Sequence, residues 1–267
     1  MYNKKLEEVF TTQALLDALN NYRKAKDYNK LLDAIISNRF QKALFTGYIP
    51  DPVRSFLIEK NEHEKRELAL SSTSSKIVQK ILVQEFKTLV DFSNRSYAYR
   101  KNKGPLKAIH RVQDILRNYF WIAKADIDNF FDTINQEILI QKLNKLIHDK
   151  RFLKLISLFI SNGMLKNNQW IDKELGVYQG DNLSPLLSNI YLNDFDHYLE
   201  EKHIEFVRFA DDIIFFAKHH RNAIKILDIA DGYLNSIGLS FAKEKSYISN
   251  KKEALSILVY ASKMKLL

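Results

Sequence analysis

The sequence contains no cysteine among its 267 residues. This absence excludes disulfide bonds and every zinc site that needs thiolate ligands. It also suits a reducing compartment, so we expect a cytoplasmic protein. Glycine and proline are scarce, with seven and four residues, which predicts few loops and a helix-rich fold.

Long apolar runs are absent as well. No stretch approaches the roughly 18 apolar residues of a membrane-spanning helix, and there is no lipidation motif. The charged start, Met1–Glu8, does not fit a signal peptide. Basic residues outnumber acidic ones by 41 to 32, a net charge of +9, and hydrophobic residues make up 46%. We therefore expect a globular protein whose partner is a polyanion and not a membrane.

Two adjacent aspartates stand between two short apolar runs. The runs Ile204–Arg208 and Ile213–Phe216 are rich in β-branched and aromatic residues, which predicts a hairpin with Asp211 and Asp212 at its turn. Adjacent carboxylates repel each other and gain most from a hard divalent cation. A simple polar turn is the alternative, but the strands are too apolar for an exposed hairpin.

A second group of carboxylates follows a predicted strand, Tyr119–Ile127. Asp126 ends the apolar part of this strand, and Asp128 lies on the same side if the strand continues through both. Turn or cap roles are the alternative for Asp128 and Asp132. A carboxylate at a strand end, near a pair from another strand, is what a two-metal phosphoryl-transfer site requires, with metals about 3.5–4 Å apart.

A third segment runs from Gly176 to Leu192. Gly176 and Gly180 bracket a loop, and their freedom would let the backbone lie close to a ligand. Ser184 and Pro185 then open a predicted helix, with serine at the cap and proline in the first turn.

The spacing of apolar residues elsewhere indicates an α+β domain in which helices alternate with antiparallel hairpins. Thr73 or Ser74 suits the cap of one helix. Helices are predicted at two places within 5–45 and over 76–89, 105–118, 135–149, 151–161 and 220–236. Hairpins are predicted over 55–70 and 165–177, and a short strand after Gly238.

Taken in order, the three segments resemble the palm motifs of reverse transcriptases, Asp-x-x-x-x-Phe/Tyr, Gln-Gly-x-x-x-Ser-Pro and Ala-Asp-Asp. Here they read Asp126 with Phe131, Gln179-Gly180 with Ser184-Pro185, and Ala210-Asp211-Asp212. Their form is most similar to the bacterial group II intron lineage. That lineage includes CRISPR-associated enzymes, often fused to an integrase subunit, and other defence-associated ones.

The resemblance covers about residues 50–250 and implies a right-hand polymerase fold. It implies an N-terminal helical segment (1–50), fingers (51–118), a palm with an antiparallel sheet packed on helices (119–250), and the start of a palm–thumb connection (251–267). Only 22 residues follow Lys245, so we expect the thumb to be absent or truncated and the chain to be a fragment. Tyr178 replaces the usual proline before Gln179, which puts the rigidity of that loop in doubt.

The implied activity is RNA-directed DNA synthesis, in which deoxynucleoside triphosphates are added to the 3′-hydroxyl of a DNA or RNA primer on an RNA template. Asp126 and Asp211 would hold two Mg²⁺ ions, for which Mn²⁺ substitutes, with Asp212 a weaker participant. Lys245 would donate a proton to pyrophosphate, and Phe131 would exclude a 2′-hydroxyl. Gln179 and Gly180 would contact the templating strand or the incoming base. The triphosphate would meet Lys60, Lys65 and Arg66.

Basic residues gather within seventeen positions, with Tyr97 and Tyr99 among them. They are Arg95, Arg100, Lys101, Lys103, Lys107 and Arg111. Basic side chains between aromatic ones suit a nucleic-acid backbone with base or sugar contacts. A solvated loop is the alternative.

Two other functions stay open. The same carboxylates would serve template-independent or protein-primed nucleotide addition by a defence reverse transcriptase. Without a thumb, the chain would instead be a nucleic-acid-binding module with an inactive polymerase site. A CRISPR integrase or another fused or associated domain is the further partner that the lineage suggests.

Overall fold

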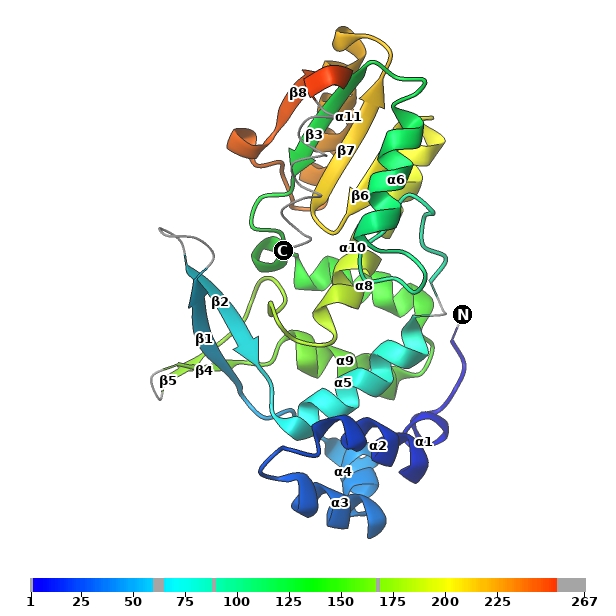
Figure 1. The fold of residues 1–267 in the computed structure, drawn as a ribbon. Helices are drawn as coiled ribbons and strands as arrows, with labels where there is room; N and C mark the ends of the chain where they lie inside the picture. Colours follow the sequence, from blue (N-terminus) through cyan, green and yellow to red (C-terminus); the bar gives the residue numbers. More distant parts are fainter. Residues whose placement is uncertain (1, 60–64, 88–89, 167–168, 254–267) are drawn as a thin grey trace. The chain divides into compact units, whose positions relative to one another are not determined.

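The computed structural model describes residues 2–59, 65–87, 90–166 and 169–253, and the chain divides into two compact units (Figure 1). The first unit comprises Met1–Asp91 and Ile134–Leu187, and the second Phe92–Thr133 and Ser188–Leu267. In this division residues 134–187 belong with the N-terminal part, and the expected bounds of fingers and palm stay a prediction. Within the described residues no helix is both long and apolar enough to cross a bilayer.

Helices make up most of the first unit. They are α1 (Leu6–Val9), α2 (Thr12–Leu19), the 3₁₀ turn η1 (Asn20–Tyr22), α3 (Tyr28–Ile36), α4 (Arg39–Gly47), α5 (Thr73–Phe86), α8 (Gln136–Leu146) and α9 (Lys150–Ile160). The cap of α5 is Ser72, whose hydroxyl accepts the Ser75 amide at 3.2 Å, so the predicted caps at Thr73 and Ser74 were wrong. The rings of Tyr2, Phe86 and Phe152 pack edge to face at centroid distances of 5.1–5.8 Å and join the N-terminus to α5 and α9.

The first unit also contains a four-stranded sheet in the order β2-β1-β4-β5. Its strands are β1 (Val53–Glu59), β2 (Lys65–Leu70), β4 (Met164–Lys166) and β5 (Gln169–Ile171). Both predicted hairpins are thereby confirmed, although the strands of the second end at Ile171 and not at Val177. Only Val53 is buried in β1, whereas Phe56, Leu57 and Ile58 are exposed, so the hairpin packs on the unit through its base alone.

The second unit is built on a sheet in the order β6-β7-β3-β8, and every pairing in it is antiparallel. The strands are β3 (Trp121–Asp126), β6 (Glu205–Phe209), β7 (Asp212–Ala217) and β8 (Tyr247–Asn250). The helices are α6 (Pro105–Ile115), α7 (Phe130–Thr133), α11 (His220–Ser236), the 3₁₀ turn η2 (Lys243–Lys245) and most of α10 (Ser184–Glu201). The expected α+β class is confirmed.

The two faces of this sheet are covered differently (Figure 1). On one face Ile122, Val207 and Phe216 are buried against α6, while Phe209 and Ile214, further along the same face, are only partly buried. Burial therefore decreases toward the end of β3 and the start of β7. Helix α11 packs on the opposite face, against β3 and β7.

Candidate active site

Asp126 and Asp212 lie opposite each other in the sheet of the second unit. Asp126 is the last residue of β3, Asp212 is the first of β7, and the two are paired in register. Residues directly opposed in an antiparallel pair point to the same face, with Cβ atoms about 4.5–5.5 Å apart. Apolar pairs such as Ile122 with Phe216 fix this register, so the core of the unit brings the two carboxylates together.

Asp211 lies in a two-residue turn. Phe209 pairs with Asp212, so Ala210 and Asp211 alone connect β6 to β7. The hairpin expected from the sequence is confirmed, but Asp212 belongs to the strand, so its predicted place in the turn was wrong. The Asp211 carbonyl accepts a hydrogen bond from the Ile127 amide at 3.2 Å, which ties the turn to the end of β3.

A lysine neutralises each carboxylate of the Asp126–Asp212 pair. Lys245 Nζ lies 3.2 Å from Asp126, and Lys124 Nζ lies 3.1 Å from Asp212. The hydrogen bond to Asp126 raises the pKa of Lys245 above its ordinary value. Burial lowers the pKa of Lys124, but the charge and the hydrogen bond of Asp212 together with the nearby Tyr247 and Asp126 outweigh it, and the pKa is raised. Both ammonium groups therefore stay charged beside the carboxylates.

Asp128 and Asp132 take the turn roles that the sequence left open. Strand β3 ends at Asp126, so Asp128 does not continue the alternation of the strand. Its amide donates to the Ser240 carbonyl at 2.9 Å, and its carbonyl accepts from Thr133 Oγ1 at 3.2 Å. Asp132 is exposed in the single turn of α7.

The carboxylates present fit a divalent ion that arrives with phosphate. Among the described residues no three histidine, aspartate or glutamate side chains form a ready cluster for a metal ion. Mg²⁺ in phosphoryl-transfer sites needs no such cage, because one or two carboxylates hold it together with substrate phosphates. The ammonium groups beside Asp126 and Asp212 show that these oxygens already attract cations.

Two consecutive phenylalanines follow Asp126 and differ in burial. Phe130 is 2% exposed and belongs to the core, whereas Phe131 is only partly buried. Their ring centroids are 5.5 Å apart. The buried ring therefore supports one side of Phe131 and leaves part of it accessible.

Gln179 and Gly180 lie in the first unit, in a loop held by its own chain. The Gln179 carbonyl accepts the Ala69 amide of β2 at 2.7 Å, and Tyr178 Oη donates to the Asn162 carbonyl at 2.8 Å. A Cβ atom on Gly180, whose φ is +97°, would lie 3.0 Å from the Ala69 carbonyl oxygen. Glycine is thus required here by the approach of β2, and buried Tyr178 anchors the loop in place of a rigid proline.

The same loop is fastened by a buried carboxylate that the sequence did not reveal. Asp181 is 6% exposed and accepts hydrogen bonds from Ser71 Oγ and, at 2.8 Å, from Gln79 Nε2. Gln79 in turn accepts the Asn182 amide at 3.1 Å. Burial raises the pKa of Asp181, while its two donors oppose the shift.

Two of the three predicted triphosphate contacts belong to the hairpin of the first unit. Lys65 and Arg66 belong to β2, where their backbones pair with Glu59 and Ile58 of β1. Their side chains and Lys60 lie outside the described residues, so these three roles stay predictions.

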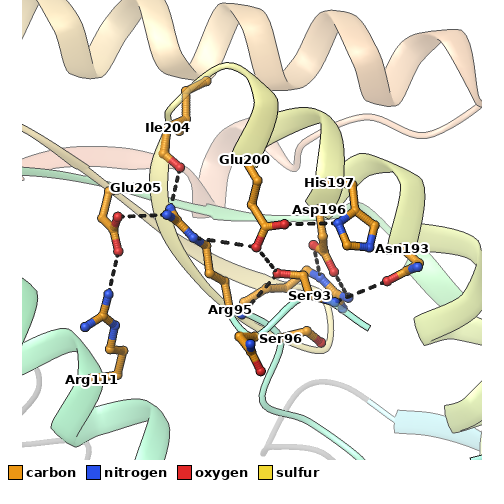
Figure 2. A network of polar contacts seen from close by, with 12 residues as sticks. Ser93, Arg95, Ser96, Arg111, Asn193, Asp196, His197, Glu200, Ile204 and Glu205 are labelled. Carbon is orange, nitrogen blue, oxygen red and sulfur yellow. Dashed lines mark hydrogen bonds and ion pairs between the residues drawn. The ribbon is translucent and has the colours of Figure 1, made fainter. Parts of the chain in front are cut away.

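Several members of the basic cluster are engaged by the protein itself. Figure 2 shows Arg95 between Glu200 and Glu205, at 3.7 and 3.0 Å, with Arg111 on the other oxygen of Glu205 at 2.9 Å. Arg95 also donates to the Ile204 carbonyl at 2.6 Å. Arg100 donates to the carbonyls of Ser93 and Ser96. Arg95 and Arg111 therefore hold this part of the chain to β6 through Glu205, while Arg100 braces the segment internally.

The lysines of the cluster are less constrained. Lys103 lies over the buried Tyr97 ring, 4.4 Å from its centroid, and donates to the Asn94 carbonyl. Lys101 and Lys107 are exposed, and Lys107 donates only to the carbonyl of Asn102 among the described contacts. Any phosphate contact from this cluster is expected chiefly at these two lysines.

Two residues of the site have no role among those expected from the sequence. Lys124 precedes Asp126 by two positions, so strand alternation alone places it on the carboxylate face. Arg208 stands within the apolar run of β6, and a charge there signals a buried partner. The described site residues of the second unit are Lys124, Asp126, Phe131, Arg208, Asp211, Asp212 and Lys245.

Comparison with known proteins places these motifs in context. Residues 58–261 match the family model for reverse transcriptase (RNA-dependent DNA polymerase). The chain is 30% identical to protein YkfC of Escherichia coli, over 68% of this chain and 48% of YkfC. It is 29% identical to the group II intron-encoded protein LtrA of Lactococcus lactis, over 60% of this chain and 27% of LtrA. The chain thus spans about a quarter to a half of these relatives.

The fold is similar to that of telomerase. The structure of telomerase from Candida albicans, solved with a fragment of telomeric RNA, matches with a TM-score of 0.61 at 15% identity. The match covers 83% of this chain and 47% of the telomerase chain. At this identity the likeness concerns the fold alone, and it agrees with the expected fingers and palm.

Proposed function

We propose a polymerase function for this chain because it belongs to the reverse transcriptase family of RNA-dependent DNA polymerases. The proposed reaction adds deoxynucleotides to the 3′-hydroxyl of a DNA or RNA primer, directed by an RNA template. The observation that carries the proposal is the register that sets Asp126 opposite Asp212, with Asp211 in the adjoining turn.

Asp126 and Asp211 are the proposed ligands of two divalent ions, Mg²⁺ or Mn²⁺. Asp212 is a weaker participant because Lys124 already engages its carboxylate. When bound, such ions lower the pKa of the primer hydroxyl and neutralise the triphosphate. The chain contributes carboxylates held at one end of the central strands of a packed sheet, so little reorganisation is needed as charge develops.

Lys245 is the proposed proton donor to the leaving pyrophosphate. Its raised pKa keeps the ammonium protonated at neutral pH, which is the form that a general acid requires. Half of its side-chain surface, 49%, is exposed, so it remains accessible to a triphosphate.

The remaining roles concern nucleotide and template. The partly exposed ring of Phe131 is proposed to exclude a 2′-hydroxyl. Gln179 and Gly180 are proposed to contact the templating strand or the incoming base, while Lys60, Lys65 and Arg66 bind the triphosphate. Lys101 and Lys107 are the exposed basic residues proposed to track the backbone of the duplex. An integrase subunit is a further proposed partner, which the gene neighbourhood would test.

Primer extension tests the proposal. Wild type, Asp211→Asn and Asp228→Asn are compared on an RNA template with a DNA primer, with Mg²⁺ or Mn²⁺. Asp228 is exposed on α11, so Asp228→Asn removes the same charge at a position away from the turn. We expect Asp211→Asn to lose nearly all incorporation and Asp228→Asn to retain it.

Two further arms separate the alternatives. Incorporation that is equally fast without a template would indicate template-independent addition. Tight binding of an RNA–DNA hybrid with no incorporation by wild type would indicate a binding module. Asp211→Asn activity within a few-fold of wild type would refute the proposed palm site.

A further inference from the structure

Arg208 is a buried cation two residues before the turn that carries Asp211. It belongs to β6, and its side chain and that of Asp196 are both 0% exposed. A charge removed from water in this way is tolerated only when its partners satisfy it fully. Arg208 should therefore have a defined set of contacts.

Its guanidinium joins helix α10 to the turn. Nε donates to Asp196 Oδ1 at 2.7 Å, and Nη2 donates to the other oxygen of the same carboxylate. Nη1 donates to Asn189 Oδ1 at 3.1 Å and to the Ala210 carbonyl at 3.0 Å. Figure 2 shows Asp196 on the helix beside this network. Two side chains of one helix thus aim the arginine at one backbone carbonyl.

Ala210 needs such support. Its φ is +59°, in the left-handed region, which residues other than glycine rarely adopt without compensating contacts. The peptide group whose oxygen Arg208 holds joins Ala210 to Asp211. Rotation of that peptide would change the direction of the Asp211 carboxylate relative to Asp126.

The base of the network is itself anchored. The Arg208 amide donates to the Arg95 carbonyl, and its carbonyl accepts the Tyr97 amide, each at 2.9 Å. Asn189 Nδ2 donates to the Ala98 carbonyl at 2.9 Å. The segment of residues 95–98, α10 and the turn therefore meet at Arg208, the segment through its backbone and the other two through its side chain.

We propose that Arg208 is a positioning residue that fixes the Ala210–Asp211 peptide, and hence the Asp211 carboxylate, with Asp196 and Asn189 as its fixed supports. Its effect on catalysis rests on the proposed polymerase function. Its effect on the turn does not. Lys124 and Lys245 do not share this role, because they contact the carboxylates of Asp212 and Asp126 directly.

The test must remove the contact without leaving a bare buried charge. Arg208→Met alone would leave Asp196 ionised in the core and destabilise the whole unit. The double variant Arg208→Met with Asp196→Leu replaces both charges by apolar groups of similar size, a change that is often tolerated. Leu234→Ala, which truncates a fully buried side chain of α11, is the matched control for general loss of stability.

Two readouts are compared in wild type, the double variant and the control. Hydrogen exchange in peptides spanning residues 207–213 reports the turn without any reaction. In the double variant we expect this exchange to be at least about tenfold faster than in wild type, with the other strands protected as before. In primer extension we expect kcat to fall and the half-saturating Mg²⁺ concentration to rise about tenfold, whereas the control keeps the wild-type requirement.

Unchanged exchange at the turn in a folded double variant would overturn the proposal. Equal loosening of the turn and of all four strands would also overturn it, because Arg208 would then be only part of the core. If wild type shows no polymerisation, the proposed function fails, and the exchange measurement alone still decides the role of Arg208.

Discussion

The ammonium group of Lys124 lies 3.1 Å from the carboxylate of Asp212, on the strand next to its own. It supplies positive charge to a site whose three aspartates would otherwise repel one another. A bound divalent cation would supply the same compensation. The lysine and a metal ion should therefore be partly interchangeable in stabilising this edge of the sheet.

Lys124→Met should lower the melting temperature in the presence of EDTA by about 1–3 °C, since partly exposed ion pairs contribute little. Excess Mn²⁺ should reduce the difference in melting temperature between the variant and wild type, because the cation then replaces the lost charge. Differential scanning calorimetry with and without the metal measures this. Lys124→Arg, which keeps the charge, is the control, and a deficit independent of metal would contradict the prediction.

Phe131→Val should relax the choice of sugar. Shrinking the partly exposed ring opens space for a 2′-hydroxyl, so we expect incorporation of ribonucleotides relative to deoxynucleotides to rise at least about tenfold, or about 1.4 kcal/mol. The ratio of the two kcat/KM values cancels any general loss of activity.

Phe130→Leu provides the control for this experiment. Phe130 is buried beside Phe131, so its truncation should lower stability and leave the ratio of the two sugars near that of wild type. If the ratio of ribonucleotide to deoxynucleotide incorporation changes equally in both variants, Phe131 is part of the core and does not select the sugar.

The salt dependence of binding should separate the lysines of the basic cluster from its arginines. In a plot of log affinity against log salt for an RNA–DNA hybrid, Lys101→Ala with Lys107→Ala should reduce the slope by roughly one for each lost phosphate contact. Arg95→Ala should lower stability with little change of slope, because Arg95 is engaged by Glu200 and Glu205. Identical slopes in wild type and the double lysine variant would indicate that these lysines lie in a solvated loop and do not contact phosphate.

The stability difference between Asp181→Asn and wild type should depend on pH. Burial raises the pKa of Asp181 in the folded protein, so the folded state holds a proton that the unfolded state has released. The contribution of Asp181 to the free energy of unfolding therefore falls as pH rises from its ordinary pKa toward the raised value. Because asparagine does not titrate, the stability of the variant should increase relative to that of wild type as pH rises across that window.

Urea unfolding at a series of pH values between about 4 and 8 measures this difference. Exposed Asp228→Asn is the control for loss of one charge without burial. A difference between Asp181→Asn and wild type that stays constant over the series would refute the predicted linkage.

Local patterns were sufficient to identify much of the fold. The helix predicted over 220–236 is α11 with the same bounds, and the runs around Asp211 form the expected hairpin. These elements depend on side-chain periodicity and turn chemistry over a few residues. For the same reason the end of β3 at Asp126 was predicted to within one residue, at Ile127.

The partners of charged groups depended on tertiary structure. The cluster from Arg95 to Arg111 is read from the sequence as a surface for phosphate, yet Glu205 of a distant strand engages two of its arginines. Nothing near Arg208 in sequence reveals that Asp196 neutralises it within the core. Such pairings follow from which strands and helices pack together, and this is decided by the summed burial of apolar surface across the chain.

The sequence by itself thus determined that carboxylates lie at the end of one strand and at the turn of a hairpin, because those properties are local, although it placed Asp212 in the turn and not in β7. Only the tertiary structure decided that Asp126 faces Asp212, that two lysines neutralise the pair, and that Arg208 holds the adjoining turn. The register of β3 against β7 is set by apolar pairs remote from the carboxylates, and a shift of one residue would turn each aspartate to the other face.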